Sequence, residues 1–139
     1  MSNALKTPSF TPAVGRLLMS AIFILSGVGK LAAPAATIGY IASTGLPLAT
    51  LGYAAAVMIE LGGGLLLLAG YQTRLVAFGL ALFSIVTALI FHHAFGDQNQ
   101  MIHFLKNLAM AGGLLQLATY GAGAFSIDAR SPKLAHQTA

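Results

Sequence analysis

The sequence contains no cysteine, and this absence removes several kinds of chemistry at once. Disulfide bonds, thiolate nucleophiles, cysteine-ligated zinc and cysteine-ligated iron–sulfur clusters all require cysteine side chains. None of the 139 residues is a cysteine. The chain is therefore neither a disulfide-stabilised scaffold nor a carrier of a cysteine-bound redox centre.

Charged residues are also scarce. Only seven basic and three acidic residues are present, or 7% of the chain, against about 25% in an ordinary soluble domain. So few charged groups cannot cover a domain surface, whereas 57% of the residues are hydrophobic and the mean hydropathy is +0.81. Lipid must solvate much of this surface. Tryptophan is also absent, so any aromatic belt at the membrane interface has to use tyrosine and phenylalanine.

The basic residues give a net charge of +4, but they are scattered singly along the chain. A nucleic-acid interface needs basic residues clustered on one face or in a run that follows the phosphates. No nucleic-acid partner is therefore expected. The basic balance instead fits loops that face a cytoplasm and anionic membrane lipid.

Four apolar segments have close to the ~20 residues needed to span the hydrocarbon core. They lack strand alternation, and lipid requires every backbone group to be hydrogen-bonded internally, so each is predicted to be a helix. The four helices are expected at residues 13–31, 51–69, 75–93 and 103–120. The sequence thus predicts an all-α integral membrane protein, with a four-transmembrane-helix bundle over residues 13–125. Residues 1–12 and 126–139 are expected to be flexible cytoplasmic tails.

The connections between these helices differ in length. Pro34 and Pro47 bracket a moderately apolar piece that is too short to span, which predicts an interfacial or re-entrant helix between the first two helices. Residues 70–74 form a tight turn, with Gly70 suited to a helix C-cap and Thr73 to an N-cap. The second and third helices should therefore be antiparallel neighbours.

Orientation follows from the lysine and arginine residues near the helix ends. Five of them fall on one side of the predicted bundle and two on the other: Lys6, Arg16, Arg74, Arg130 and Lys133 against Lys30 and Lys106. Both termini are thus expected in the cytoplasm, with the 34–47 segment and the Asp97 loop outside. Cleavage of the first helix as a signal peptide is disfavoured, because Lys30 interrupts its apolar run before the weak cleavage-like site.

Glu60 lies near the middle of the second predicted helix. A charge at this depth costs several kcal/mol unless it is paired or hydrated. The carboxyl group is therefore expected to be protonated or to pair with a cation of a neighbouring helix. Two interpretations stay open: an acid that exchanges protons or holds a ligand, and a structural interhelical hydrogen bond.

The first predicted helix carries its polar residues along one face. The spacing of Arg16, Ser20, Phe23, Gly27 and Lys30 is 4, 3, 4 and 3 residues, so this seam should face the bundle interior. Arg16, like Arg74, is expected to be a structural charge. The alternative for residues near helix ends is that they extend to the lipid headgroups.

The densest group of polar residues lies where the third helix ends and the fourth begins. Together with Lys30 it is expected to converge above Glu60 on the outer side, as an imidazole-lined, cationic pocket for a quinone headgroup or a small anion. Glu60 and His103 are the candidate catalytic groups. The candidate ligand-binding residues are Lys30, His92, His93, Lys106 and Asn107.

The histidines could also be considered as ligands of a metal ion or a haem. No dense ligand motif supports a metal, and haem would need two axial ligands facing each other across the bundle. Haem and metal are therefore disfavoured, no covalent cofactor is expected, and a bound quinone is the cofactor hypothesis. The plain alternative has the histidines hydrogen-bonded to headgroups and loop backbone.

A series of short motifs follows in a characteristic order. They are Arg16-Leu17-Leu18, Ser26-Gly27-Val28-Gly29-Lys30, Glu60-Leu61-Gly62-Gly63-Gly64, Gly70-Tyr71-Gln72-Thr73-Arg74 and Ile102-His103-Phe104-Leu105-Lys106-Asn107. With these motifs the sequence resembles the DoxX family of bacterial membrane proteins, over roughly residues 16–130. The resemblance implies a four-helix fold in the bacterial inner membrane. It also implies kinship with the DoxD and DoxX subunits of thiosulfate:quinone oxidoreductase and with membrane redox complexes.

These observations lead to three functional hypotheses. The first is a quinone-interacting membrane subunit of a redox system, in which a partner subunit supplies the electrons. The second is a non-enzymatic scaffold or assembly subunit, or a binder of lipid or another small molecule. The third is a small transporter, which with four helices would have to form a homo-oligomer for alternating access.

Overall fold

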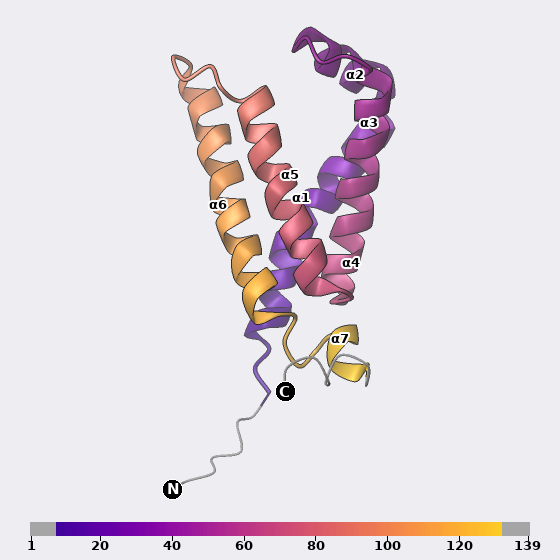
Figure 1. The fold of residues 1–139 in the computed structure, drawn as a ribbon, viewed down its shortest axis with the longest axis vertical. Helices are drawn as coiled ribbons and strands as arrows, with labels where there is room; N and C mark the ends of the chain where they lie inside the picture. Colours follow the sequence, from indigo (N-terminus) through magenta and orange to yellow (C-terminus); the bar gives the residue numbers. More distant parts are fainter. Residues whose placement is uncertain (1–7, 132–139) are drawn as a thin grey trace, which may run out of the picture.

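The computed structural model describes residues 8–131, and all of the regular structure in that range is helical. Figure 1 shows the elements in order along the chain. They are α1 (Thr11–Ala32), α2 (Pro34–Ser43), α3 (Ala49–Val57), the π-helical turn η1 (Met58–Gly62), α4 (Gly63–Ala69), α5 (Thr73–Phe91), α6 (Gln98–Tyr120) and α7 (Ile127–Arg130). The all-α prediction is confirmed for this range. Lys6 and Lys133, used to predict orientation, lie outside it.

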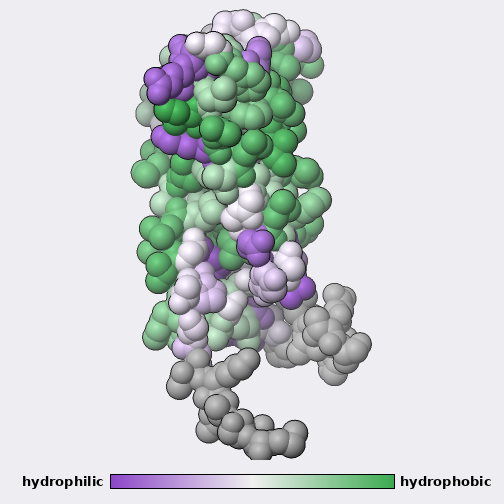
Figure 2. Space-filling model, turned by 90° about the vertical axis from the view of Figure 1, so that its left-hand side faces the viewer, coloured by the Kyte–Doolittle hydropathy of each residue, from purple (hydrophilic) through white to green (hydrophobic). Residues whose placement is uncertain are grey.

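Three of the described helices are long and apolar enough to cross a membrane. They are α1, the continuous rod from Ala49 to Ala69 that comprises α3, η1 and α4, and α5. The fourth long helix, α6, has 23 residues and runs beside α5 (Figure 1). Its amide, histidine and lysine side chains make it less apolar than the other three. Figure 2 shows hydrophobic surface through the middle of one face and more hydrophilic residues toward both ends.

The helix α1 contacts the rod through its small and polar face. Arg16, Ser20, Phe23 and Gly27 are buried, which confirms four of the five residues of the predicted seam, whereas Lys30 is only partly buried. A Cβ atom on Gly27 would lie 2.6 Å from Leu61 Cγ. Close approach of the two helices therefore depends on the absence of a side chain at this position.

The helix α5 joins this pair to α6. A buried cluster of apolar side chains fills the contact region: Phe23, Leu67, Ala77, Leu80, Ala81, Ala111 and Leu114. These residues come from α1, α4, α5 and α6. The buried core is thus shared by α1, the rod, α5 and α6.

Two predicted helix ends differ in the structure. The third helix ends at Phe91, so His92 and His93 follow it instead of closing it. The fourth begins at Gln98, five residues before the predicted start, because the Asp97 carboxylate caps it. Asp97 Oδ1 accepts hydrogen bonds from the backbone N–H groups of Asn99 and Gln100, at 2.7 and 3.2 Å.

The tight turn between the rod and α5 is capped in an unexpected way. Gly70 has φ of 69° and ends α4, as predicted. The prediction of Thr73 as the N-cap of α5 is wrong, because Asp128 of α7 performs this role from a distant part of the chain. Its carboxylate oxygens accept hydrogen bonds from the N–H groups of Gln72 and Thr73, at 2.8 and 2.9 Å. The segment predicted as a tail from residue 126 therefore begins with an ordered helix.

Arg16 fastens the same end of the molecule. Its Nη1 donates to the carbonyl oxygens of Leu67 and Leu68, at 3.2 and 2.7 Å. Its Nε donates to Ala122 O at 3.0 Å, and its Nη2 donates to Phe125 O. One guanidinium group thus joins α1 to the end of α4 and to the segment that follows α6. Arg74 is exposed nearby, close to Gly121.

The predicted short helix between the first two long helices is present as α2. It lies at the same end of the molecule as the α5–α6 loop, whereas α7 lies at the opposite end (Figure 1). The ring of Tyr40 in α2 stacks on Phe91 at the end of α5, with centroids 5.5 Å apart. This contact brings α2 over the space between α1 and α5.

Candidate ligand pocket

Glu60 lies on the π-helical turn η1, in the middle of the rod from Ala49 to Ala69. Single π-helical turns inside α-helices are frequent at functional sites. The residue is buried, with only 6% of its surface exposed. Sequence reasoning located the acid but missed the turn that presents it.

Lys30 of α1 is the partner of this acid. Its Nζ lies 2.8 Å from Glu60 Oε2 and donates a hydrogen bond to Glu60 Oε1 at 3.1 Å. No other salt bridge occurs within residues 8–131. The sequence left open a protonated carboxyl group or one paired with a cation of a neighbouring helix, and the structure shows the pairing.

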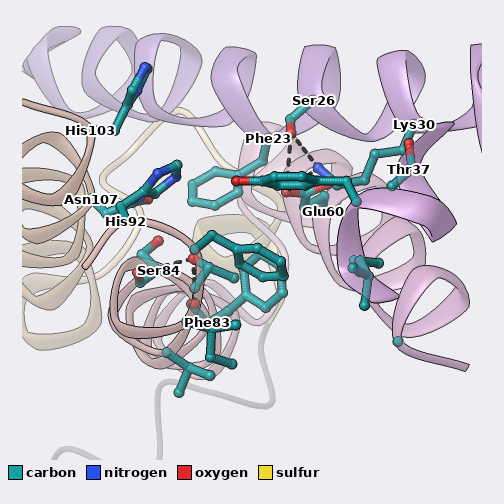
Figure 3. A pocket seen from close by; sticks show the side chains of 18 of the residues that line it. Phe23, Ser26, Lys30, Thr37, Glu60, Phe83, Ser84, His92, His103 and Asn107 are labelled. Atoms are coloured by element: carbon teal, nitrogen blue, oxygen red, sulfur yellow. Dashed lines mark hydrogen bonds and ion pairs between the residues drawn. The ribbon is translucent and has the colours of Figure 1, made fainter. Parts of the chain in front are cut away.

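Ser26 completes this group, and sequence reasoning had not selected it as a site residue. Lys30 Nζ donates to Ser26 Oγ at 2.8 Å, and Ser26 Oγ donates to Glu60 Oε1 at 3.1 Å (Figure 3). The available signal was its position four residues before Lys30, on the same helical face. Lys30, Ser26 and Glu60 are called the ion-pair cluster below.

The ion-pair cluster presents its members unequally. The Lys30 side chain is 25% exposed and that of Glu60 only 8%. Glu60 Oε2 is buried and accepts no hydrogen bond of good geometry, although it lies within ion-pair distance of Nζ. A molecule approaching the cluster would therefore meet Lys30 first and interact with Glu60 mainly through it.

The cluster borders a cavity of about 700 Å³. This volume falls within the range of small-molecule binding sites, which are mostly apolar with a few directed polar groups. The apolar part of the lining comes from α1, α2, α3, α5 and α6 and is rich in aromatic rings. It includes Ile22, Phe23, Tyr40, Ile41, Phe83, Val86, Ile90, Phe91 and Met110.

A second polar group lines the cavity away from the ion-pair cluster. Figure 3 shows His92, His103 and Asn107 on the opposite side of Phe23 from Glu60 and Lys30. The rings of His92 and His103 stack with centroids 5.1 Å apart. His92 Nδ1 lies 3.1 Å from Gln100 Oε1, a neighbour that the sequence did not suggest. Together with Lys106, these three residues are called the imidazole cluster.

The structure brings most of the predicted site residues to this cavity. Lys30, Glu60, His92, His103, Lys106 and Asn107 all line it. His93 does not line it and is exposed. Arg16 and Arg74 belong to the other end of the fold, away from the candidate chemistry.

The chemistry available in the cavity is hydrogen bonding and proton exchange. Lysine ammonium groups and amides donate hydrogen bonds, and imidazoles exchange protons near neutral pH. Over residues 8–131, no three or more histidine, aspartate or glutamate residues are grouped so as to hold a metal ion. The two clusters therefore offer donors at two sides of an apolar space.

Comparison with known proteins gives a consistent result. The model of the DoxX family matches residues 11–93. The chain is 41% identical over 115 residues to inner membrane protein YqjF of Escherichia coli K12, covering 83% of this chain and 87% of that protein. It is 36% identical over 122 residues to inner membrane protein YphA of the same organism, covering 84% and 87%. No solved structure matches the chain.

Proposed function

Because this chain belongs to the DoxX family, we propose that it is a multi-pass inner-membrane protein whose cavity binds a quinone headgroup. It would serve as the quinone-interacting membrane subunit of a redox system. Both relatives are named inner membrane proteins, and three helices here have the length and apolarity to cross a bilayer. The proposal that the protein binds a quinone rests on the cavity between the two polar clusters.

The proposed topology has four crossings, made by α1, the α3–α4 rod, α5 and α6. The 23-residue length of α6 and its packing along α5 support the fourth crossing. The helix α2 would lie at the outer interface or re-enter there. Among the described residues, Arg16, Arg74 and Arg130 gather toward the α7 end, which favours cytoplasmic termini.

A quinone headgroup fits the donor set of this cavity. It is a flat apolar ring with carbonyl oxygens at opposite ends, and each of these oxygens accepts hydrogen bonds. Lys30 of the ion-pair cluster can donate to one carbonyl, and His103 or Asn107 can donate to the other. The aromatic rings of Phe23 and Phe83 suit the faces of a flat ring. This opposed placement of donors is the observation that carries the proposal.

Each polar residue would then have a definite role. Lys30 polarises one carbonyl, while Glu60 holds the ammonium group in position and offsets its charge. His103 and the stacked His92 place imidazole groups where they can donate a proton to the ligand or accept one from it. A bound quinone would supply two-electron chemistry, and a partner subunit would exchange the electrons.

The first test is the quinone content of the purified protein. The full chain is extracted in native-like lipid, and the bound quinone is measured by mass spectrometry against protein concentration. We expect roughly stoichiometric quinone in the wild type and about a tenfold weaker retention in His103→Ala, since one lost hydrogen bond to a charged or polarised group is worth about 1.4 kcal/mol or more. Quinone content no higher than in the bulk lipid would overturn the proposal.

His93→Ala is the matched control, because it removes an imidazole from the same region without touching the cavity. It should retain quinone as the wild type does. Equal losses in the two variants would assign the effect to the loop and not to the cavity.

One observation favours a second candidate function. Glu60 is nearly fully buried, as expected if the ion-pair cluster only locks α1 to the rod of a scaffold subunit. In that case Lys30→Met would lower stability, but His103→Ala would change no ligand content.

A further inference from the structure

We infer that the cavity selects a headgroup that carries one negative charge, with Lys106 as the residue that recognises it. This inference rests on the proposed quinone function and specifies the ligand class. It follows from the charged residues that line the cavity.

The ion-pair cluster contributes no net charge. Lys30 Nζ lies 2.8 Å from Glu60 Oε2, so the ammonium and carboxylate groups offset each other. Glu60 is also the only acidic residue among those that line the cavity. Nothing acidic in the lining therefore remains to balance a second cation.

Lys106 is that second cation. It lines the cavity from α6 and forms no salt bridge with any residue in the described range. The chain has only two other acids, and both have other partners. Asp97 caps the start of α6, about 14 Å along the helix from Lys106, and Asp128 caps α5 at the opposite end of the molecule.

The position of Lys106 makes an unbalanced charge expensive. It lies more than two turns into α6 and its side chain is exposed, so in the proposed topology its charge meets the open cavity and lipid without a counter-charge. Its neighbours in the imidazole cluster, His103 and Asn107, are neutral or cationic groups that cannot replace a carboxylate. A ligand with an ionised oxygen beside a carbonyl would supply the missing charge and accept hydrogen bonds from these neighbours. Acidic hydroxyquinones have this chemistry.

Two naphthoquinones of nearly equal size distinguish the effect of ligand charge on binding from the effect of ligand shape. The first is 2-hydroxy-1,4-naphthoquinone, which is ionised at neutral pH, and the second is its 2-methoxy analogue, which stays neutral. Binding of each is measured by equilibrium dialysis against the full chain in phosphatidylcholine nanodiscs, with empty nanodiscs to correct for partition into lipid. We expect the wild type to bind the anion about tenfold more tightly than the neutral compound.

The variants assign this preference to one side chain. Lys106→Gln should reduce the preference to less than about twofold, because it weakens binding of the anion more than binding of the methoxy compound, and Lys106→Arg should retain the preference. Arg74→Gln, which removes an exposed cation at the other end of the fold, should have no effect.

The possible outcomes distinguish failure of the quinone function from failure of the preference for an anionic headgroup. If neither compound binds above the lipid blank, both the quinone function and the charge preference fail. If both bind equally to the wild type, the quinone function stands and the inference is overturned, with Lys106 extending to lipid headgroups instead. A preference that survives in Lys106→Gln would also overturn the role of this residue.

Discussion

Replacing Arg16 by methionine is expected to lower the free energy of unfolding by about 3–5 kcal/mol. The guanidinium group donates to four backbone carbonyl oxygens, and it is only 2% exposed. Leu68 O lies at the end of α4, where no further helical turn supplies a donor, whereas Leu67 O also accepts the N–H of Gly70 at 3.1 Å. The methionine side chain fills similar volume but leaves all four carbonyls without this donor.

Lysine at the same position tests whether charge or geometry matters. An ammonium group keeps the charge but cannot reproduce the planar donors of arginine, so Arg16→Lys should lie between the wild type and Arg16→Met. The measurement is equilibrium unfolding in mixed micelles followed by circular dichroism. Arg74→Met is the control, because Arg74 is exposed and its loss should change stability by about 0.5 kcal/mol or less. Similar stabilities for the two methionine variants would contradict the proposed role of Arg16.

Replacing Lys30 by methionine is expected to lower the free energy of unfolding by about 3 kcal/mol. The change leaves Glu60 buried, with Ser26 as its only remaining side-chain donor among residues 8–131. Glu60→Gln should cost less, about 2 kcal/mol, because Lys30 is more exposed than Glu60 and can reach water or headgroups.

The double variant Lys30→Met with Glu60→Met separates pairing from burial. Replacement of both members of a buried ion pair by apolar residues is often close to neutral, so the double variant should be more stable than Lys30→Met alone. The same unfolding assay gives the coupling free energy, which we expect to be at least about 1 kcal/mol. Additive losses would show that the two side chains act independently, against the geometry observed.

The sequence was sufficient to predict the helices and much of the packing. Long apolar runs define the rods, and the spacing of Arg16, Ser20, Phe23 and Gly27 correctly placed them on the buried face of α1. Glu60 stood out because a carboxyl group in an apolar run needs a partner. Pairing with a cation of a neighbouring helix was one of two alternatives, and the structure identifies that cation as Lys30.

Other features depend on contacts that no local pattern contains. The π-helical turn at Glu60 interrupts a run that reads as an ordinary helix. Asp128 caps α5 from more than fifty residues away, so the turn sequence alone favoured Thr73. His93 was grouped with His92 because they are adjacent, but only His92 turns into the cavity once the helix ends at Phe91. In each case the path of the backbone determines which groups come into contact.

We propose that a quinone headgroup occupies the cavity between the ion-pair cluster and the imidazole cluster. The most direct test of this proposal is a photoreactive short-chain quinone, cross-linked to the full chain in nanodiscs and mapped by mass spectrometry. We expect adducts on cavity residues such as Tyr40 and Met110, and these adducts should be lost when excess unmodified quinone competes. Adducts confined to outward-facing residues such as Leu25 and Leu89, and unaffected by competition, would contradict it.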